Sequence, residues 1–202
     1  MGIRLISVRT SQNCYIYGTN GPMFPKRTLN LGILRLSVFR RMRVSSSEIN
    51  LAEKGSMPIE LSGSWAIDTN ILIYSLDEDS VHFKKMKSFW RDIWGRQDIQ
   101  LAIADQVLTE SHNVLSKIYH IKHQEIADLL QEFMQTLPIV RIKPRTNTFG
   151  HFLNKIVEQQ SVDVFDAYLA ATLLDNRIDG LVTANTRHFK DIAGLELFDP
   201  TR

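Results

Sequence analysis

Asp166 lies on a face of a predicted helix where an apolar residue is expected. The helix covers Val164–Asn176, and Asp166 shares the i, i+3, i+4, i+7 spacing of Leu169, Ala170 and Leu173. A carboxylate on a buried face is costly unless a partner compensates its charge. No lysine or arginine lies within one turn of it in the sequence, so we expect a cation or a proton as that partner.

Glu110 and Asp68 depart from the expected pattern in related ways. Glu110 occupies an inward position between two valines of a second predicted helix. Asp68 directly follows the apolar segment Trp65–Ile67, which is typical of a buried strand. In parallel α/β sheets, sites form just beyond the carboxyl ends of the strands. Asp68, Glu110 and Asp166 are therefore candidates for one shared site.

Three carboxylates this close together cannot all ionise without a cation. Ligand sets made only of oxygen favour Mg²⁺ or Mn²⁺ over zinc. Such an ion can polarise a phosphoryl oxygen and activate a water molecule for in-line attack on a phosphodiester. Each acid alone could equally be a helix cap or a boundary residue. The three together indicate metal-dependent phosphodiester chemistry.

Further polar residues flank these acids. Asp163 directly precedes the helix of Asp166, so we expect it first to cap that helix and second to support the rim of the site. Thr183 and Asn185 follow a late predicted strand and could hold a metal-bound water or a phosphate. On local sequence alone, ordinary turn chemistry explains these two residues better.

Several other classes of site are excluded by the sequence. The single cysteine, Cys14, rules out an internal disulfide and a Cys-based zinc cluster. No GxxxxGK[ST] phosphate-binding loop is present, and Ser111 lacks the His and Asp pattern of a nucleophile. No apolar run approaches the roughly 18 residues that a membrane helix needs, so we expect no membrane partner.

The elements that must position these residues alternate along the chain. Predicted strands cover Trp65–Ile67, Ile99–Ala104, Ile139–Ile142, Leu181–Thr183 and Leu195–Phe198. Predicted helices cover Val81–Trp94, Gln106–Tyr119, His123–Leu137, Thr146–Gln159 and Val164–Asn176, and Gly180 is expected to stop the last of them. This alternation predicts an α/β fold, with a mostly parallel sheet covered by helices.

The two parts of the chain differ in charge. Residues 1–60 carry a net charge of +6 and residues 61–202 a net charge of −4. We predict a basic, poorly ordered extension over 1–60 and a folded domain over 61–202. The basic segment could instead be an organelle transit peptide, an arm attracted to nucleic acid, or a stretch that is not made if translation starts at Met57.

Four segments, in order, resemble the motifs of PIN-domain nucleases: Ile67–Leu72, Leu108–Glu110, Asp163–Ala171 and Leu181–Phe189. The resemblance runs from about Trp65 to the C-terminus. It implies a three-layer α/β/α sandwich around a central parallel sheet. It also implies a ribonuclease that depends on Mg²⁺ or Mn²⁺, with Asp68, Glu110 and Asp166 as the metal ligands. Many members carry a fourth acid where this chain has His188.

Within that family the chain looks most similar to VapC-type toxins. This similarity implies a cytoplasmic, usually homodimeric endoribonuclease that cleaves RNA and is held inactive by an antitoxin. Arg187 and Lys190 would then guide the RNA backbone. Two alternatives stay open: an inactive PIN-like module that binds RNA or protein, and a nuclease for structured DNA.

Overall fold

The computed structural model describes residues 60–158 and 163–202. The predicted N-terminal extension therefore lies outside the described residues apart from Glu60, and so does the predicted helix end at Gln159.

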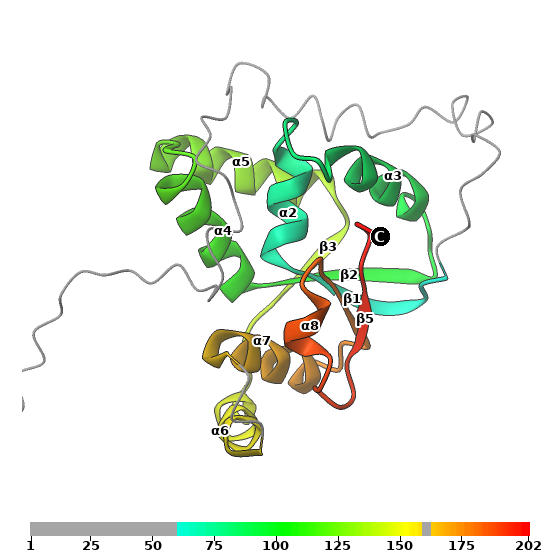
Figure 1. Ribbon diagram of the computed structural model, residues 1–202, viewed down its shortest axis with the longest axis vertical. Coiled ribbons are helices and arrows are strands. Elements are labelled where there is room, and N and C mark those ends of the chain that lie inside the picture. Colours follow the sequence, from blue (N-terminus) through cyan, green and yellow to red (C-terminus); the bar gives the residue numbers. More distant parts are fainter. Residues whose placement is uncertain (1–59, 159–162) are drawn as a thin grey trace, which may run out of the picture.

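A five-stranded sheet forms the centre of the structure, in the spatial order β3-β2-β1-β4-β5 (Figure 1). Its strands are β1 (Gly63–Ile67), β2 (Ile99–Ala104), β3 (Ile139–Ile142), β4 (Gly180–Val182) and β5 (Glu196–Phe198). Every neighbouring pair is parallel, which confirms the predicted sheet and makes it fully parallel. The apolar runs in these strands follow from this arrangement, because helices cover parallel sheets on both faces.

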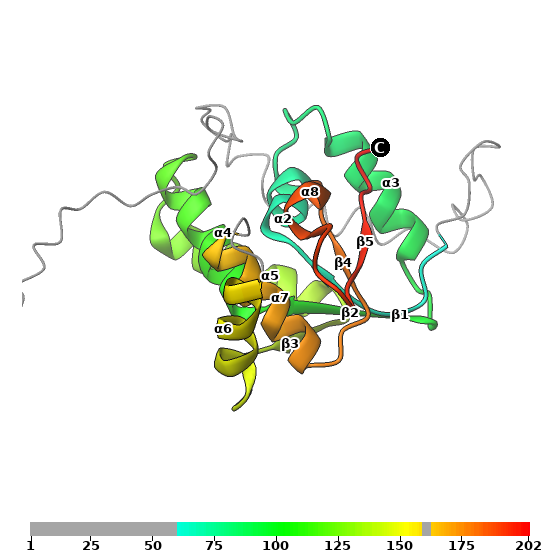
Figure 2. The same ribbon diagram turned by 60° about the horizontal axis from the view of Figure 1, so that its bottom comes forward.

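The described helices are α2 (Thr69–Leu76), α3 (Phe83–Ile93), α4 (Asp105–Lys117), α5 (His123–Thr136), α6 (Thr148–Glu158), α7 (Val164–Asp175) and α8 (Thr186–Phe189). The chain moves from β1 to β2 to β3 in one direction and then returns past β1 to β4. Right-handed crossovers therefore place the helices of the two halves on opposite faces. Figures 1 and 2 show α3 and α7 on opposite sides of β1 and β2. The predicted three-layer α/β/α fold is confirmed.

Two helices were not predicted from the sequence, and Gly180 has a different role. Every residue of α2 is buried, so its apolar residues show no 3.6-residue period from which a helix could be recognised. Helix α8 has only four residues. The prediction that Gly180 stops the preceding helix is wrong, because α7 ends at Asp175 and Gly180 begins β4.

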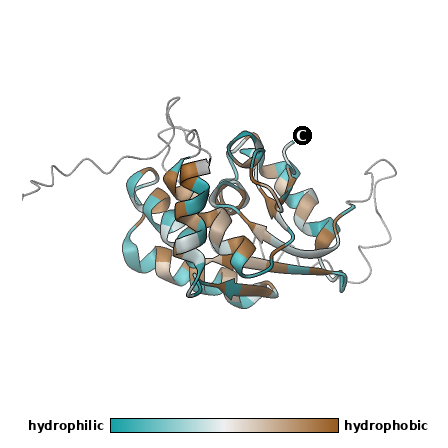
Figure 3. Ribbon diagram, turned by 90° about the horizontal axis from the view of Figure 1, so that it is seen from below, coloured by the Kyte–Doolittle hydropathy of each residue, from teal (hydrophilic) through white to brown (hydrophobic). Residues whose placement is uncertain are grey.

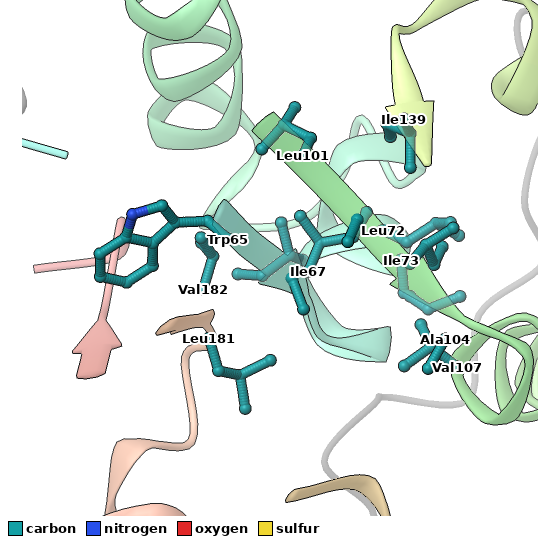
Figure 4. Packing of buried hydrophobic residues seen from close by; sticks show 14 of the residues in the cluster. Trp65, Ile67, Leu72, Ile73, Leu101, Ala104, Val107, Ile139, Leu181 and Val182 are labelled. Atoms are coloured by element: carbon teal, nitrogen blue, oxygen red, sulfur yellow. The ribbon is translucent and has the colours of Figure 1, made fainter. Parts of the chain in front are cut away.

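The core lies between the sheet and the helices. Figure 4 shows Ile67, Leu72, Leu101 and Val182 among its buried side chains, and each of them is at most 6% exposed. Apolar colour in Figure 3 follows the inner segments of strands and helices, whereas the outer helix faces are largely polar. Within the described ranges, no helix has the length and apolar character needed to cross a membrane.

Candidate active site at the carboxyl edge of the sheet

The candidate site lies where the sheet changes direction, between β1 and β4. Asp68 directly follows β1, and Thr183 directly follows the neighbouring strand β4. The Asp68 backbone N–H donates to the Val182 carbonyl at 3.0 Å, which fixes the two strand ends side by side. The point where the strand order of a sheet reverses is called its switch point. A crevice there is the usual place for a ligand in an open α/β sheet.

The Asp68 carboxylate is buried, with only 8% of the residue exposed. Its Oδ1 accepts from the Thr69 backbone N–H at 2.7 Å, which also caps α2. Its Oδ2 accepts from the Thr183 hydroxyl at 2.6 Å and from the Asn70 amide at 2.7 Å. Burial raises the pKa of Asp68 despite these hydrogen bonds, which lower it. The ionised form of Asp68 is therefore costly unless a further positive charge nearby compensates it.

Asn70 joins the two strand ends and was not predicted as a site residue. Its Nδ2 also lies 3.1 Å from the Thr183 hydroxyl, and its Oδ1 accepts from the Ala184 backbone N–H at 3.0 Å. The signal available in the sequence was its position two residues after Asp68. The predicted supporting residue Thr183 is fully buried and contacts Asp68 directly.

Glu110 reaches the site from α4. Its Oε2 accepts from the Thr69 hydroxyl at 2.8 Å, so Thr69 links Glu110 to the Asp68 loop. Glu110 was predicted at an inward position of its helix; the residue as a whole is exposed, but its carboxylate faces the Asp68 loop. Its carboxyl end nevertheless loses much of its hydration. That desolvation, followed by the charge of Asp68, raises the pKa of Glu110 to about 7.

Asp166 lies in the first turn of α7, and its partner is His188 of α8. Oδ2 of Asp166 and Nδ1 of His188 are 2.9 Å apart, and Nδ2 of Asn185 lies 2.7 Å from the same ring nitrogen. Burial, followed by the charges of Asp68 and Asp163, raises the pKa of Asp166 to about 7. Burial, followed by the charge of Arg187, lowers the pKa of His188. Both shifts favour the neutral forms, so the contact is a hydrogen bond more than an ion pair.

Asp163 has the capping role expected first. It is the N-cap of α7, and its Oδ1 accepts from the Phe165 backbone N–H at 2.8 Å. Its charge also raises the pKa of both Glu110 and Asp166, which places it electrostatically at the rim of the site. Asp191 lies beyond α8 and is exposed.

The donor chemistry of these residues fits a hard divalent cation. Burial raises the pKa of Asp68, Glu110 and Asp166, and the charge of Asp68 adds to this effect at Glu110 and Asp166. Within the described residues, the ion pairs of lysine and arginine involve other acids. No three His, Cys, Asp or Glu side chains within 60–158 and 163–202 come close enough to enclose an ion together. A cation bound here would therefore keep part of its coordination shell for water or substrate.

Comparison with known proteins identifies the family to which this fold belongs. The PIN domain family matches residues 66–195. The fold is similar to VapBC2 from Rickettsia felis bound to a DNA fragment from its promoter, with a TM-score of 0.52, 20% identity, and coverage of 68% of this chain and 98% of that one. It is similar to VapBC-1 from nontypeable Haemophilus influenzae, with a TM-score of 0.52, 20% identity, and coverage of 69% and 100%. No curated protein matches. The chain belongs to the PIN domain family.

Proposed function

We propose that this chain is an endoribonuclease that requires Mg²⁺ or Mn²⁺, and that the side chains of Asp68, Glu110 and Asp166 move closer together to hold the ion when it binds. The observation that carries the proposal is the buried Asp68 carboxylate at the β1–β4 switch point, coupled to two further acids whose pKa is about 7. A divalent cation would offset the mutual repulsion of these groups. When bound, it would polarise the scissile phosphate and acidify a water molecule.

The chain's own residues would orient the acids and the attacking water. Thr183 and Asn70 hold Asp68 Oδ2, which leaves the carboxylate little freedom to rotate. Thr69 holds one oxygen of Glu110. Glu110 would bind the ion directly or through a water molecule, and would help to position the attacking water. Thr183 also accepts from the Asn185 backbone N–H at 3.0 Å, which positions the loop that leads to His188.

We further propose that the chain is the toxin of a toxin–antitoxin pair and that its partner is an antitoxin. Support comes from the family and from the fold that it shares with proteins solved as VapBC assemblies. Expression of the chain alone in bacteria should arrest growth, and the Asp68→Asn variant should not. Equal growth of the two cultures, with both proteins present in soluble form, would contradict the toxin role. Light scattering would test the expected homodimer.

The nuclease proposal is tested by Asp68→Asn and Asp166→Asn, with Asp128→Asn on the exposed face of α5 as the matched control. Each site variant should lower the rate of RNA cleavage with Mn²⁺ by about 10²–10³-fold, as the loss of a group that acts on the transition state does. The control should cleave like the natural protein. Undiminished cleavage by folded site variants would remove the proposed mechanism.

A second function, an inactive module that binds RNA or protein, is favoured by one observation. His188 contacts Asp166 directly, in the position where the family resemblance expects a further acid. Calorimetry separates the two functions, since a nuclease should bind Mn²⁺ in a manner that depends on Asp68. Assays on matched RNA and DNA substrates would detect a preference for structured DNA.

A further inference from the structure

Three basic side chains from distant parts of the sequence lie along one side of the candidate site. Lys85 belongs to α3, Arg187 to α8, and Arg202 follows β5. All three are exposed, and the Arg202 side chain is 79% exposed. Residues 61–202 carry a net charge of −4, so such a group of cations is not a general property of this surface.

Hydrogen bonds connect the segment Thr201–Arg202 to both helices. Its Nε lies 3.0 Å from Asp199 Oδ2, and its Nη2 donates to the Thr186 hydroxyl of α8 at 3.3 Å. The preceding residue, Thr201, accepts through its carbonyl oxygen from Lys85 Nζ. The segment Thr201–Arg202 thus lies between α3 and α8. It brings Lys85 and Arg202 close to each other.

The surface continues to the acids of the site through α8. Arg187 stands between Thr186, which contacts Arg202, and His188, which contacts Asp166. A continuous series of contacts therefore leads from Asp166 through α8 to the chain end and α3.

Asp199 is the acid that pairs with Arg202 in this surface. Its position leaves the Arg202 guanidinium able to bind a phosphate group. Its side chain is only 8% exposed, whereas the guanidinium that it holds is largely exposed. Asp199 and Thr186 therefore fix the Nε and Nη2 side of the guanidinium, and the side chain as a whole stays largely exposed. A planar fork held in this way suits the oxygens of a phosphate group.

We propose that Lys85, Arg187 and Arg202 form a surface that binds the phosphate backbone of an RNA strand and leads it to the carboxylates. The sequence had suggested Arg187 and Lys190 for this role. The inference rests on the proposed ribonuclease function and adds the path of its substrate. Contacts of this kind contribute affinity and orientation rather than base specificity.

The test measures the binding of a labelled single-stranded RNA by fluorescence anisotropy at a series of salt concentrations. EDTA is present throughout, which prevents cleavage. The variants are Lys85→Ala/Arg187→Ala/Arg202→Ala and a control, Lys117→Ala/Lys122→Ala/Lys143→Ala. The control removes the same charge from the last residue of α4, the N-cap of α5 and the residue that follows β3, which is the edge strand opposite β5.

We expect the surface variant to bind RNA at least about tenfold more weakly, with a salt slope smaller by about 2, or roughly 0.7 for each lost phosphate contact. The control should change affinity less than about twofold. Unchanged affinity of the surface variant, or an equal loss in both variants, would overturn the proposal. So would a variant that keeps RNA affinity but loses affinity for a polyglutamate peptide, because the partner would then be an acidic protein.

The result is separable from the fate of the ribonuclease proposal. Cleavage of RNA by the natural protein, together with undisturbed binding by the surface variant, would remove only this inference. Salt-dependent binding through the surface without any cleavage would remove only the catalytic function. Circular dichroism would verify the fold, and the three single variants, each expected to lower the slope by about 0.7, replace the triple variant if it is unfolded.

Discussion

His188 Nδ1 lies 2.9 Å from Asp166 Oδ2, although the two residues are 22 positions apart in the sequence. The contact gives the half-buried Asp166 carboxyl group a hydrogen-bond partner from another element. It also brings an imidazole, in place of another acid, to the centre of the candidate site. Because burial and Arg187 lower the pKa of His188, this group adds little positive charge at neutral pH. The site therefore holds one negative charge fewer than it would with a carboxylate at this position.

Replacing His188 with Asp should strengthen binding of Mn²⁺ by about tenfold, the lower end of the range for groups that orient metal ligands. A new carboxylate beside Asp166 would increase the negative potential of the site. Calorimetric titration with Mn²⁺ measures the change. His188→Asn, which adds no charge, is the control and should not tighten binding. Equal affinities of the natural protein and the Asp variant would contradict the placement of His188 beside the ion.

The metal-free protein should lose stability as pH rises from about 4.5 to about 7. The folded-state pKa of Glu110 and of Asp166 is raised to about 7, so the folded protein retains protons that the unfolded chain has already released. Stability falls with pH wherever the folded state binds more protons. Thermal melting in EDTA should thus give a lower Tm at pH 8 than at pH 5.5.

The double variant Glu110→Gln/Asp166→Asn should show a smaller decrease in Tm over the same pH interval, because it lacks the two carboxyl groups. Asp128→Asn should retain the full decrease. If Tm changed with pH in the double variant as it does in the natural protein, the pKa of these two carboxyl groups would not be raised by folding.

Thr183→Val should destabilise the protein by about 1–3 kcal/mol, the cost of leaving buried polar partners unsatisfied. The substitution keeps the shape of the side chain and removes the hydroxyl that donates to Asp68 and accepts from the Asn185 backbone. Urea unfolding measures the difference. Ser111→Ala is the matched control, since its buried hydroxyl has no hydrogen-bond partner among the described residues, and its removal should be neutral or stabilising. Equal effects of the two substitutions would argue against the hydrogen-bond network around Asp68.

Gly180→Ala should destabilise the fold by about 1–3 kcal/mol, as overpacking does in a tightly packed core. A Cβ atom at this position would lie 2.3 Å from the ring of Trp65, and Gly180 also pairs with Trp65 in the sheet. Gly150→Ala provides the contrast, because a Cβ there meets nothing within 4 Å and alanine favours the helix α6. Thermal melting compares the two, with the Tm expected to fall for the first variant only.

The sequence determined the parts of this protein that depend on local pattern. The alternating elements, the end of β1 at Asp68 and the cap at Asp163 follow from periodicity, polarity and capping within a few residues. Helix α2 was not predicted, because complete burial removes the polar face that gives a helix its recognisable 3.6-residue period. The exposed position of Glu110 shows the limit of such reasoning, because a residue that faces a site can have the spacing of a core residue.

Only the tertiary structure decided which distant residues meet. The order β3-β2-β1-β4-β5 brings Thr183 to Asp68 across 115 positions, and α8 brings His188 to Asp166. The same packing places Arg202 between α3 and α8. Side-chain spacing along one element records which face is buried, but it carries no information about the partner on that face. Sheet order and crossover handedness supply that information, and they arise from the packing of the whole chain.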